Sequence, residues 1–334
     1  MEFDNDTIRI AVKKYVKNEE EGIETYGHIN TWNVSNVTNM DCMFRFAVSF
    51  NQPLDNWNVS NVTNMSHMFK YAEAFNQPLN NWDVSNVTDM NRMFYEARAF
   101  NKSIDNWNVT NVTVMSWMFA YASSFNQSLD NWKDKISKVT YMQGMFFGTE
   151  SFNQPLNNWN VSNVTTMGGM FNGAISFNQS LNNWNVSNVT EMTAMFMNAT
   201  SFNQPLNNWK DKVSNVTDIS SMFDNAIAFN QPPPNSLNVD TIITDDEWNG
   251  VVDKTCPISL CWLEKKDAVR PLFNILDING NEVQELSKIL YGRLDLYKWT
   301  ILKRQCKDVY GNIINHNWYL VNYPTKMTII KKQL

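Results

Sequence analysis

Apolar and polar positions follow one pattern through most of the chain, with a period of about 25 residues. Each period begins at a tryptophan, continues through Asn, Val and Ser or Thr, reaches a Met–Phe pair and ends at a Phe–Asn–Gln phrase. The tryptophans are Trp32, Trp57, Trp82, Trp107, Trp132, Trp159, Trp184 and Trp209. A fixed period in this range is typical of a solenoid, in which each unit buries its apolar face against its neighbours. We therefore expect eight stacked turns over residues 32–231.

Within one period the spacing of the apolar residues changes. Trp57, Val59 and Val62 alternate imperfectly with polar residues, which favours a short strand over residues 59–64. The next apolar residues recur at i, i+3, i+4 and i+7, which predicts a short helix that ends before Pro78. These residues are Met65, Met68, Phe69 and Ala72. One strand, one helix and two corners per turn indicate an α/β repeat solenoid that resembles the leucine-rich repeats.

One polar column recurs as regularly as the tryptophans. An asparagine follows the last phenylalanine of every period, and we expect its side chain to bond the backbone at a corner of each turn. The column consists of Asn51, Asn76, Asn101, Asn126, Asn153, Asn178, Asn203 and Asn230. Trp132 and Trp209 are each followed by Lys–Asp–Lys, which adds two residues to those turns.

The repeated phrase carries a family resemblance. Residues 152–171 spell Phe–Asn–Gln–Pro–Leu–Asn–Asn–Trp–Asn–Val–Ser–Asn–Val–Thr–Thr–Met–Gly–Gly–Met–Phe, which resembles the DUF285 repeat, also called the BspA-like repeat. The similarity covers about residues 1–233. The family occurs in mycoplasmas and other bacteria, protists and giant DNA viruses. The resemblance implies a leucine-rich-repeat-like solenoid used for binding or adhesion, without catalytic residues, and the Asn-rich, signal-free style favours a giant virus or a protist.

The two ends of the chain depart from the repeat. Residues 1–31 are expected to form an N-terminal helical cap, because the first turn would otherwise expose an apolar end and an unpaired edge. The apolar stripe of its helix is Ile8, Ala11, Val12 and Tyr15. Residues 232–244 contain three consecutive prolines and are expected to be a stiff linker. Residues 245–334 then predict a small α+β domain, with a helix across residues 283–290.

Charge and cysteine content limit the functions of the chain. Residues 241–334 contain 13 Lys/Arg and 11 Asp/Glu, so a net charge of −6 for the whole chain leaves about −8 on the repeats. A nucleic acid requires a dense basic face, so we expect no nucleic-acid partner. No segment is apolar enough to span a membrane, and the acidic start is unlike a signal peptide. Four cysteines are too few for a disulfide framework.

The repeated Asn–x–Ser/Thr motifs bear on location. Asn58–Val59–Ser60 and Asn61–Val62–Thr63 would be glycosylation acceptors in a eukaryotic secretory pathway, and similar motifs recur in several turns. Glycans on successive turns would lie about 5 Å apart, too close to fit side by side. We therefore expect an intracellular protein that avoids this pathway.

Binding residues in a solenoid are expected where the turns differ from one another. The outward positions of the predicted helix vary, and the first four turns place aromatic residues beside Arg and Lys, a composition typical of protein-binding surfaces. The alternative is that unconstrained surface positions have simply drifted. The candidate partner-binding residues are Phe46, His67, Tyr71, Arg92, Tyr95, Trp117 and Tyr121. The expected function is a non-enzymatic protein-interaction scaffold.

The C-terminal part suggests a second function. Cys256–Pro257–Ile258–Ser259–Leu260 resembles the opening of a U-box, although Ala268 replaces the proline that the family has after Asp267. That resemblance implies a ubiquitin ligase in which Ile258 contacts a ubiquitin-conjugating enzyme and the solenoid receives the substrate. The remaining Cys and His spacings fit no standard zinc site, and no phosphate-binding loop or nucleophile motif is present. We expect no cofactor and no metal.

Overall fold

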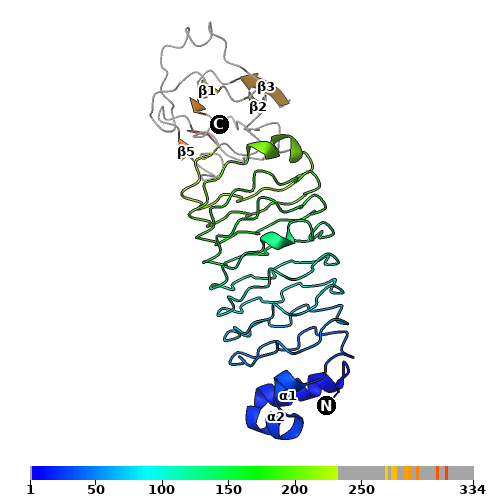
Figure 1. Ribbon diagram of the computed structural model, residues 1–334. Coiled ribbons are helices and arrows are strands. Elements are labelled where there is room, and N and C mark those ends of the chain that lie inside the picture. Colours follow the sequence, from blue (N-terminus) through cyan, green and yellow to red (C-terminus); the bar gives the residue numbers. More distant parts are fainter. Residues whose placement is uncertain are drawn as a thin grey trace. The chain divides into compact units, whose positions relative to one another are not determined.

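The computed structural model describes residues 2–231 and six short strands between residues 268 and 314. Two compact units are distinguished: Met1–Gln204 with Asp218–Phe229, and Pro205–Thr217 with Asn230–Leu334. The first unit consists of two N-terminal helices and a series of coils, where a coil is the segment from one repeat tryptophan to the next (Figure 1). None of the described helices is long and apolar enough to cross a membrane.

The N-terminal helices pack against the first coil. α1 spans Thr7–Lys17, α2 spans Glu19–Tyr26, and a 3-10 turn, η1, spans Ile29–Thr31. The apolar stripe predicted for the first helix is confirmed, because its four residues are the buried residues of α1. The ring of Phe3 lies 4.8 Å from that of Trp32, and Asn5 Oδ1 accepts hydrogen bonds from the amides of Thr38 and Asn39 at 2.9 and 3.0 Å. The N-terminal segment thus covers the first tryptophan and satisfies amides of the first coil.

Identical aromatic residues of successive coils lie over one another. The rings of Trp82 and Trp107 are stacked with centroids 6.4 Å apart, and those of Phe69 and Phe94 lie 5.5 Å apart. From Trp57 to Trp184, each indole N–H also donates to a backbone carbonyl 28–30 residues earlier, as from Trp107 to Leu79 at 2.9 Å. These bonds satisfy the one polar group that each buried tryptophan brings into the core.

The predicted helix and strand of each coil are wrong. Of the residues that the structure describes in the coils, none lies in an α-helix or an extended strand, although two short 3-10 helices occur: η2 over Asp130–Trp132 and η3 over Asn207–Lys212. The expected strand at 59–64 is reduced to single parallel bridges, such as that between Asn39 and Asn64. The apolar residues predicted for the helix are buried as expected. The periodicity therefore identified the inward side correctly and the backbone conformation incorrectly.

The backbone of this segment explains the error. The amides of Met40, Cys42, Phe44 and Phe46 donate to carbonyls of the next coil at 2.8–3.0 Å. The amides between them close tight turns, as from Met43 to the carbonyl of Met40 at 3.2 Å. Cys42 and Phe46 have φ values of 58° and 63°, so the chain reverses its curvature at every fourth residue. An α-helix would direct these amides along its own axis and leave the neighbouring coil without partners.

Two polar ladders run along the coils. The predicted role of the asparagine column is confirmed from Asn51 to Asn178: the Oδ1 of each accepts the amide of the corresponding Asn one coil later, as from Asn101 to Asn76 at 3.0 Å. The threonines form the second ladder, in which both the amide and the hydroxyl of Thr88 donate to the carbonyl of Thr63 at 2.9 and 3.2 Å. Both polar columns thus connect neighbouring coils.

The described residues of the C-terminal unit include three antiparallel strand pairs. β1 (Ala268–Val269) pairs with β4 (Tyr291–Gly292), β2 (Leu272–Leu276) with β3 (Glu282–Leu286), and β5 (Cys306–Lys307) with β6 (Ile313–Ile314). The predicted helix across residues 283–290 is wrong in its first part, because β3 pairs along its whole length with β2. The apolar residues of this segment suit the spacing of either a helix or a strand, and the hydrogen-bonded pairing with β2 selects the strand. Ile258 and the linker at 232–244 lie outside the described residues.

The asparagine ladder gives a first prediction. Asn101 Oδ1 accepts from the amide of Asn126 at 3.0 Å and from the side chain of Gln127 at 2.9 Å, so Asn101→Ala leaves two partly buried donors without this acceptor. We expect a loss of about 1–3 kcal/mol in the free energy of unfolding, measured by chemical denaturation. The control is Asn81→Ala, at an exposed residue, which should cost less than about 0.5 kcal/mol. Equal losses for the two variants would show that the ladder does not stabilise the coils.

Candidate functional site

The seven residues proposed from the sequence lie on one face of the coils. We call this the turn face and define it as residues 41–48 of the first coil with their counterparts in the later coils. It is built from the tight turns described above rather than from helices, so the expected helix face is corrected to a turn face. Two of its columns have left-handed backbone conformations, with φ between 54° and 71°.

These two left-handed columns change in composition along the chain. Both use bulky or reactive side chains in the first four coils and small or amide residues in the last four. The first column is Cys42, His67, Arg92, Trp117, Gly144, Gly169, Ala194 and Ser221. The second is Phe46, Tyr71, Glu96, Tyr121, Gly148, Gly173, Asn198 and Asn225. Left-handed conformations cost non-glycine residues about 1–2 kcal/mol each, so glycine or asparagine is the cheaper choice at every one of these positions.

The aromatic residues of the face form a continuous row across coils. Phe46 stacks on Tyr71 at 4.9 Å, Tyr71 meets Tyr95 edge-on at 5.5 Å, and Tyr95 meets Tyr121 at 5.7 Å. Phe147 extends the row, because its ring lies 5.2 Å from that of Tyr121. Phe46 is 58% exposed and Tyr121 38% exposed. Sequence reasoning missed Phe147, although it occupies the same column as Tyr95.

Three cations lie over these rings. The Arg45 guanidinium is 4.7 Å from the centre of the Phe46 ring, Lys70 Nζ is 4.9 Å from the Tyr95 ring, and the Arg92 guanidinium is 5.9 Å from the Trp117 ring. Partial burial, followed by the charges of Arg92 and Arg45, lowers the pKa of Lys70. Within residues 2–231, none of the three cations forms a salt bridge. The face therefore carries a group of positive charges that repel one another.

Glycines of the next coils make room for two of the rings. A Cβ atom on Gly144 would lie 2.4 Å from a ring carbon of Trp117, and one on Gly148 would lie 2.6 Å from a ring carbon of Tyr121. The rings of Trp117 and Tyr121 therefore lie over the backbone of the following coil. This pairing of an aromatic residue with a glycine one coil later fixes the position of both rings.

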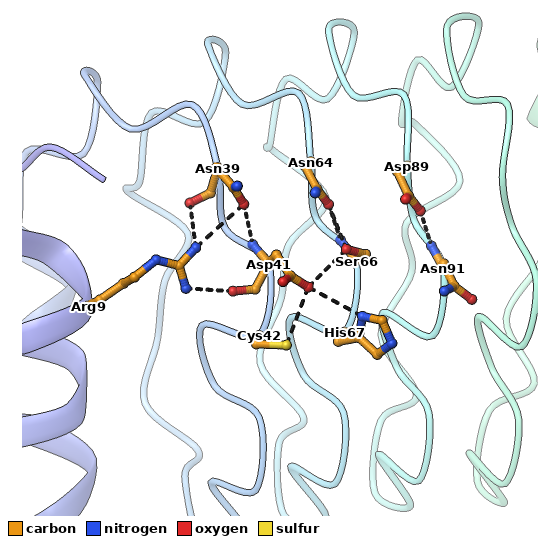
Figure 2. Close-up of polar contacts among 9 residues, drawn as sticks. All are labelled: Arg9, Asn39, Asp41, Cys42, Asn64, Ser66, His67, Asp89 and Asn91. Atoms are coloured by element: carbon orange, nitrogen blue, oxygen red, sulfur yellow. Dashed lines mark hydrogen bonds and ion pairs between the residues drawn. The ribbon is translucent and has the colours of Figure 1, made fainter. Parts of the chain in front are cut away.

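A polar cluster occupies the N-terminal end of the turn face, as Figure 2 shows. Asp41 Oδ1 accepts a hydrogen bond from Ser66 Oγ at 2.9 Å and lies 3.3 Å from both Cys42 Sγ and His67 Nδ1. Burial opposes ionisation of Asp41, but the hydrogen bonds from Ser66, Cys42 and His67 outweigh it and lower the pKa of this carboxyl. Arg9 of α1 donates to the carbonyl of Asp41 at 2.7 Å and so fixes the backbone beneath the cluster.

A pocket of about 340 Å³ lies between α1 and the first coil. Tyr15 and Val16 line it from the helix, and Phe46 and Val48 line it from the coil. Val16, Phe46 and Val48 are exposed apolar residues of its wall, whereas Glu19, Ser49, Asn51 and Gln52 add polar groups, so the pocket at the end of the aromatic row is mixed in character.

The family of the chain follows from a comparison with family models. Residues 12–132 and 133–236 match the family described as "Mycoplasma protein of unknown function, DUF285", and these two segments make up more than half of the chain. The chain belongs to the DUF285 family. A search of curated proteins and a search of solved structures found no match. The DUF285 match ends at residue 236, and the resemblance of the C-terminal part to a U-box is not supported.

The packing of Tyr121 over Gly148 gives a second prediction. Gly148→Ala introduces a Cβ that clashes with the Tyr121 ring in addition to the cost of a left-handed alanine. Gly173→Ala is the matched control, because Gly173 also has a left-handed conformation in the next coil, and the new Cβ would lie 3.5 Å from the Gly148 backbone, an ordinary van der Waals distance. We expect both variants to be destabilised in urea denaturation, and Gly148→Ala to lose about 1–3 kcal/mol more. Equal losses would contradict the proposed packing.

Proposed function

We propose that this DUF285 protein is a non-enzymatic scaffold whose turn face binds an acidic segment of a partner protein. The observation that carries the proposal is the placement of bulky side chains at left-handed positions. Phe46, Tyr71, Trp117 and Tyr121 each occupy a conformation that glycine adopts without strain and that later coils fill with glycine, alanine, serine or asparagine. Unconstrained drift would favour the cheaper residues. Strain retained at a surface is a recognised mark of functional positions.

The chemistry of the face supports a protein as the partner. Aromatic residues and arginine dominate the energetically important positions of protein interfaces. The aromatic row runs from Phe46 to Phe147, and the Arg45 guanidinium lies over its first ring. The rings are already fixed by their neighbours and by the glycines beneath them. Binding therefore restricts little additional side-chain motion, which favours affinity.

The charges of the face support an acidic segment. Arg45, Lys70 and Arg92 repel one another, and a carboxylate placed among them would relieve this repulsion. The pocket beside Phe46, where the exposed side chains of Val16 and Val48 lie among polar groups, would take a side chain of the same segment. A nucleic acid is disfavoured, because three cations on an acidic repeat provide few phosphate contacts.

Two finer statements belong to the same proposal. We propose that the coils form a leucine-rich-repeat-like solenoid and that the protein works inside a cell. The Nδ2 atom of Asn61 donates to the Ser35 carbonyl at 2.8 Å, and that of Asn86 donates to the Ser60 carbonyl at 2.8 Å. A glycan is attached at this atom and would disturb the ladder of side-chain bonds in several coils. This supports a protein that does not enter a glycosylating pathway.

The proposal predicts which peptides the full chain selects from a random display library. Peptides rich in Asp and Glu around one or two apolar residues should be enriched. Their affinity should fall with rising salt, because exposed charges are screened. The variant Arg45→Glu/Lys70→Glu/Arg92→Glu and the variant Tyr71→Ser/Tyr95→Ser/Trp117→Ser should each bind at least about 30-fold more weakly, as expected for loss of a central anchor.

The control variant makes the same change in net charge at three lysines outside the turn face. Lys102→Glu/Lys133→Glu/Lys138→Glu should bind the selected peptides within about threefold of the unaltered chain. Three results would overturn the proposal: no acidic enrichment, equal recovery on the Arg45/Lys70/Arg92 variant, or tighter binding of a single-stranded RNA oligonucleotide than of any selected peptide.

A further inference from the structure

Three metal-ligating side chains of different types converge at the N-terminal end of the turn face. Asp41 and Cys42 belong to the first coil, and His67 belongs to the second (Figure 2). Cys42 and His67 occupy the same left-handed column one coil apart, with φ values of 58° and 57°. The stacking of the coils therefore brings together residues that lie 25 positions apart in the sequence.

The distances between the ligand atoms suit one metal ion. Asp41 Oδ1 lies 3.3 Å from Cys42 Sγ and 3.3 Å from His67 Nδ1, and the three atoms all lie within 4.8 Å of one another. A triangle with these sides contains a point that lies about 2.4 Å or less from all three corners. Zinc bonds to sulfur, imidazole nitrogen and carboxylate oxygen are about 2.0–2.3 Å long. Small side-chain rotations would thus complete three bonds without a change in the backbone.

We propose that Asp41, Cys42 and His67 bind one zinc ion. A thiolate and an imidazole favour zinc over magnesium or calcium, which prefer oxygen ligands alone. On binding, the Cys42 thiol releases its proton to water and forms the sulfur–zinc bond. The Nδ1 proton that His67 directs at Asp41 in the metal-free cluster passes to Nε2 through water, and the freed lone pair of Nδ1 binds the ion. The Oδ1 of Asp41 exchanges its contacts with Sγ and Nδ1 for a bond to the ion.

A neighbouring hydroxyl orients the carboxylate in this arrangement. Ser66 Oγ donates to Asp41 Oδ1 at 2.9 Å and contacts Asn64 Oδ1 at 2.7 Å. Such outer-shell hydrogen bonds hold ligating carboxylates in place in known metal sites. The His67 side chain is 24% exposed and that of Asp41 38% exposed, so an ion can enter from solvent. Three protein ligands leave the fourth tetrahedral position for water.

The thiolate of Cys42 and the carboxylate of Asp41 would supply two negative charges that match the two positive charges of the ion.

The test is titration of the reduced, metal-stripped full chain with zinc and, separately, with cobalt. The unaltered protein should bind one zinc ion more than Cys42→Ser, and its cobalt complex should show a sulfur-to-cobalt absorption band that is weaker in this variant. The cysteines outside the cluster are present in both proteins, so the difference reports on Cys42. His67→Ala and Asp41→Asn should weaken zinc binding at this site at least about tenfold, a loss found even for outer-shell changes.

A charge-matched control separates the site from a general loss of acidity. Glu191→Gln removes a carboxylate from another coil and should leave zinc binding unchanged. Circular dichroism of each variant checks that the fold is retained, and His67→Ala and Asp41→Asn provide the test if Cys42→Ser does not fold. Equal zinc stoichiometry and affinity in the unaltered chain and in the folded cluster variants would overturn the proposal.

Discussion

Alternate amides of each turn segment donate to the carbonyls of the following coil, and the rest of the architecture depends on this bonding. Each coil can present its amides to its neighbour only if the chain reverses curvature every four residues, which requires left-handed conformations at positions such as Cys42 and Phe46. The turns between them direct Met and Phe inward at regular intervals. The aromatic columns, the asparagine ladder and the threonine ladder all follow from coils that repeat at the same spacing.

The same constraint defines the turn face. A left-handed residue of the turn face directs its side chain away from the core, so these positions are free of core packing while they remain strained for every residue except glycine. The first four coils retain large side chains there, and the later coils largely use small ones. Trp117 and Tyr121 stand at the boundary, where each ring lies over a glycine of the first small-residue coil. The change from large to small side chains along the turn face therefore occurs at the coils where aromatic rings lie over glycines.

Much of the architecture could be predicted from the sequence, since burial depends on spacing alone. The period, the inward residues, the asparagine ladder and the α1 stripe all followed from it. The helix prediction failed because tight turns interrupted every fourth residue produce the same i, i+3, i+4 and i+7 burial as a helix. One signal was available: Gly144 with Gly148 and Gly169 with Gly173 repeat a glycine pair four residues apart, which is unusual inside a helix. The cluster of Asp41, Cys42 and His67 could not be predicted, because only the coil stacking makes neighbours of its columns.

Coil-to-coil bonding in this DUF285 protein has an evolutionary consequence. The contacts between neighbouring coils come from backbone groups and from residues that are nearly identical in each copy, whereas the turn-face side chains take no part in the alternate amide bonding. Insertion or deletion of one whole coil would therefore leave the register of the others intact. The order of residues along the turn face can then change by gain or loss of whole coils, while the contacts between coils stay the same.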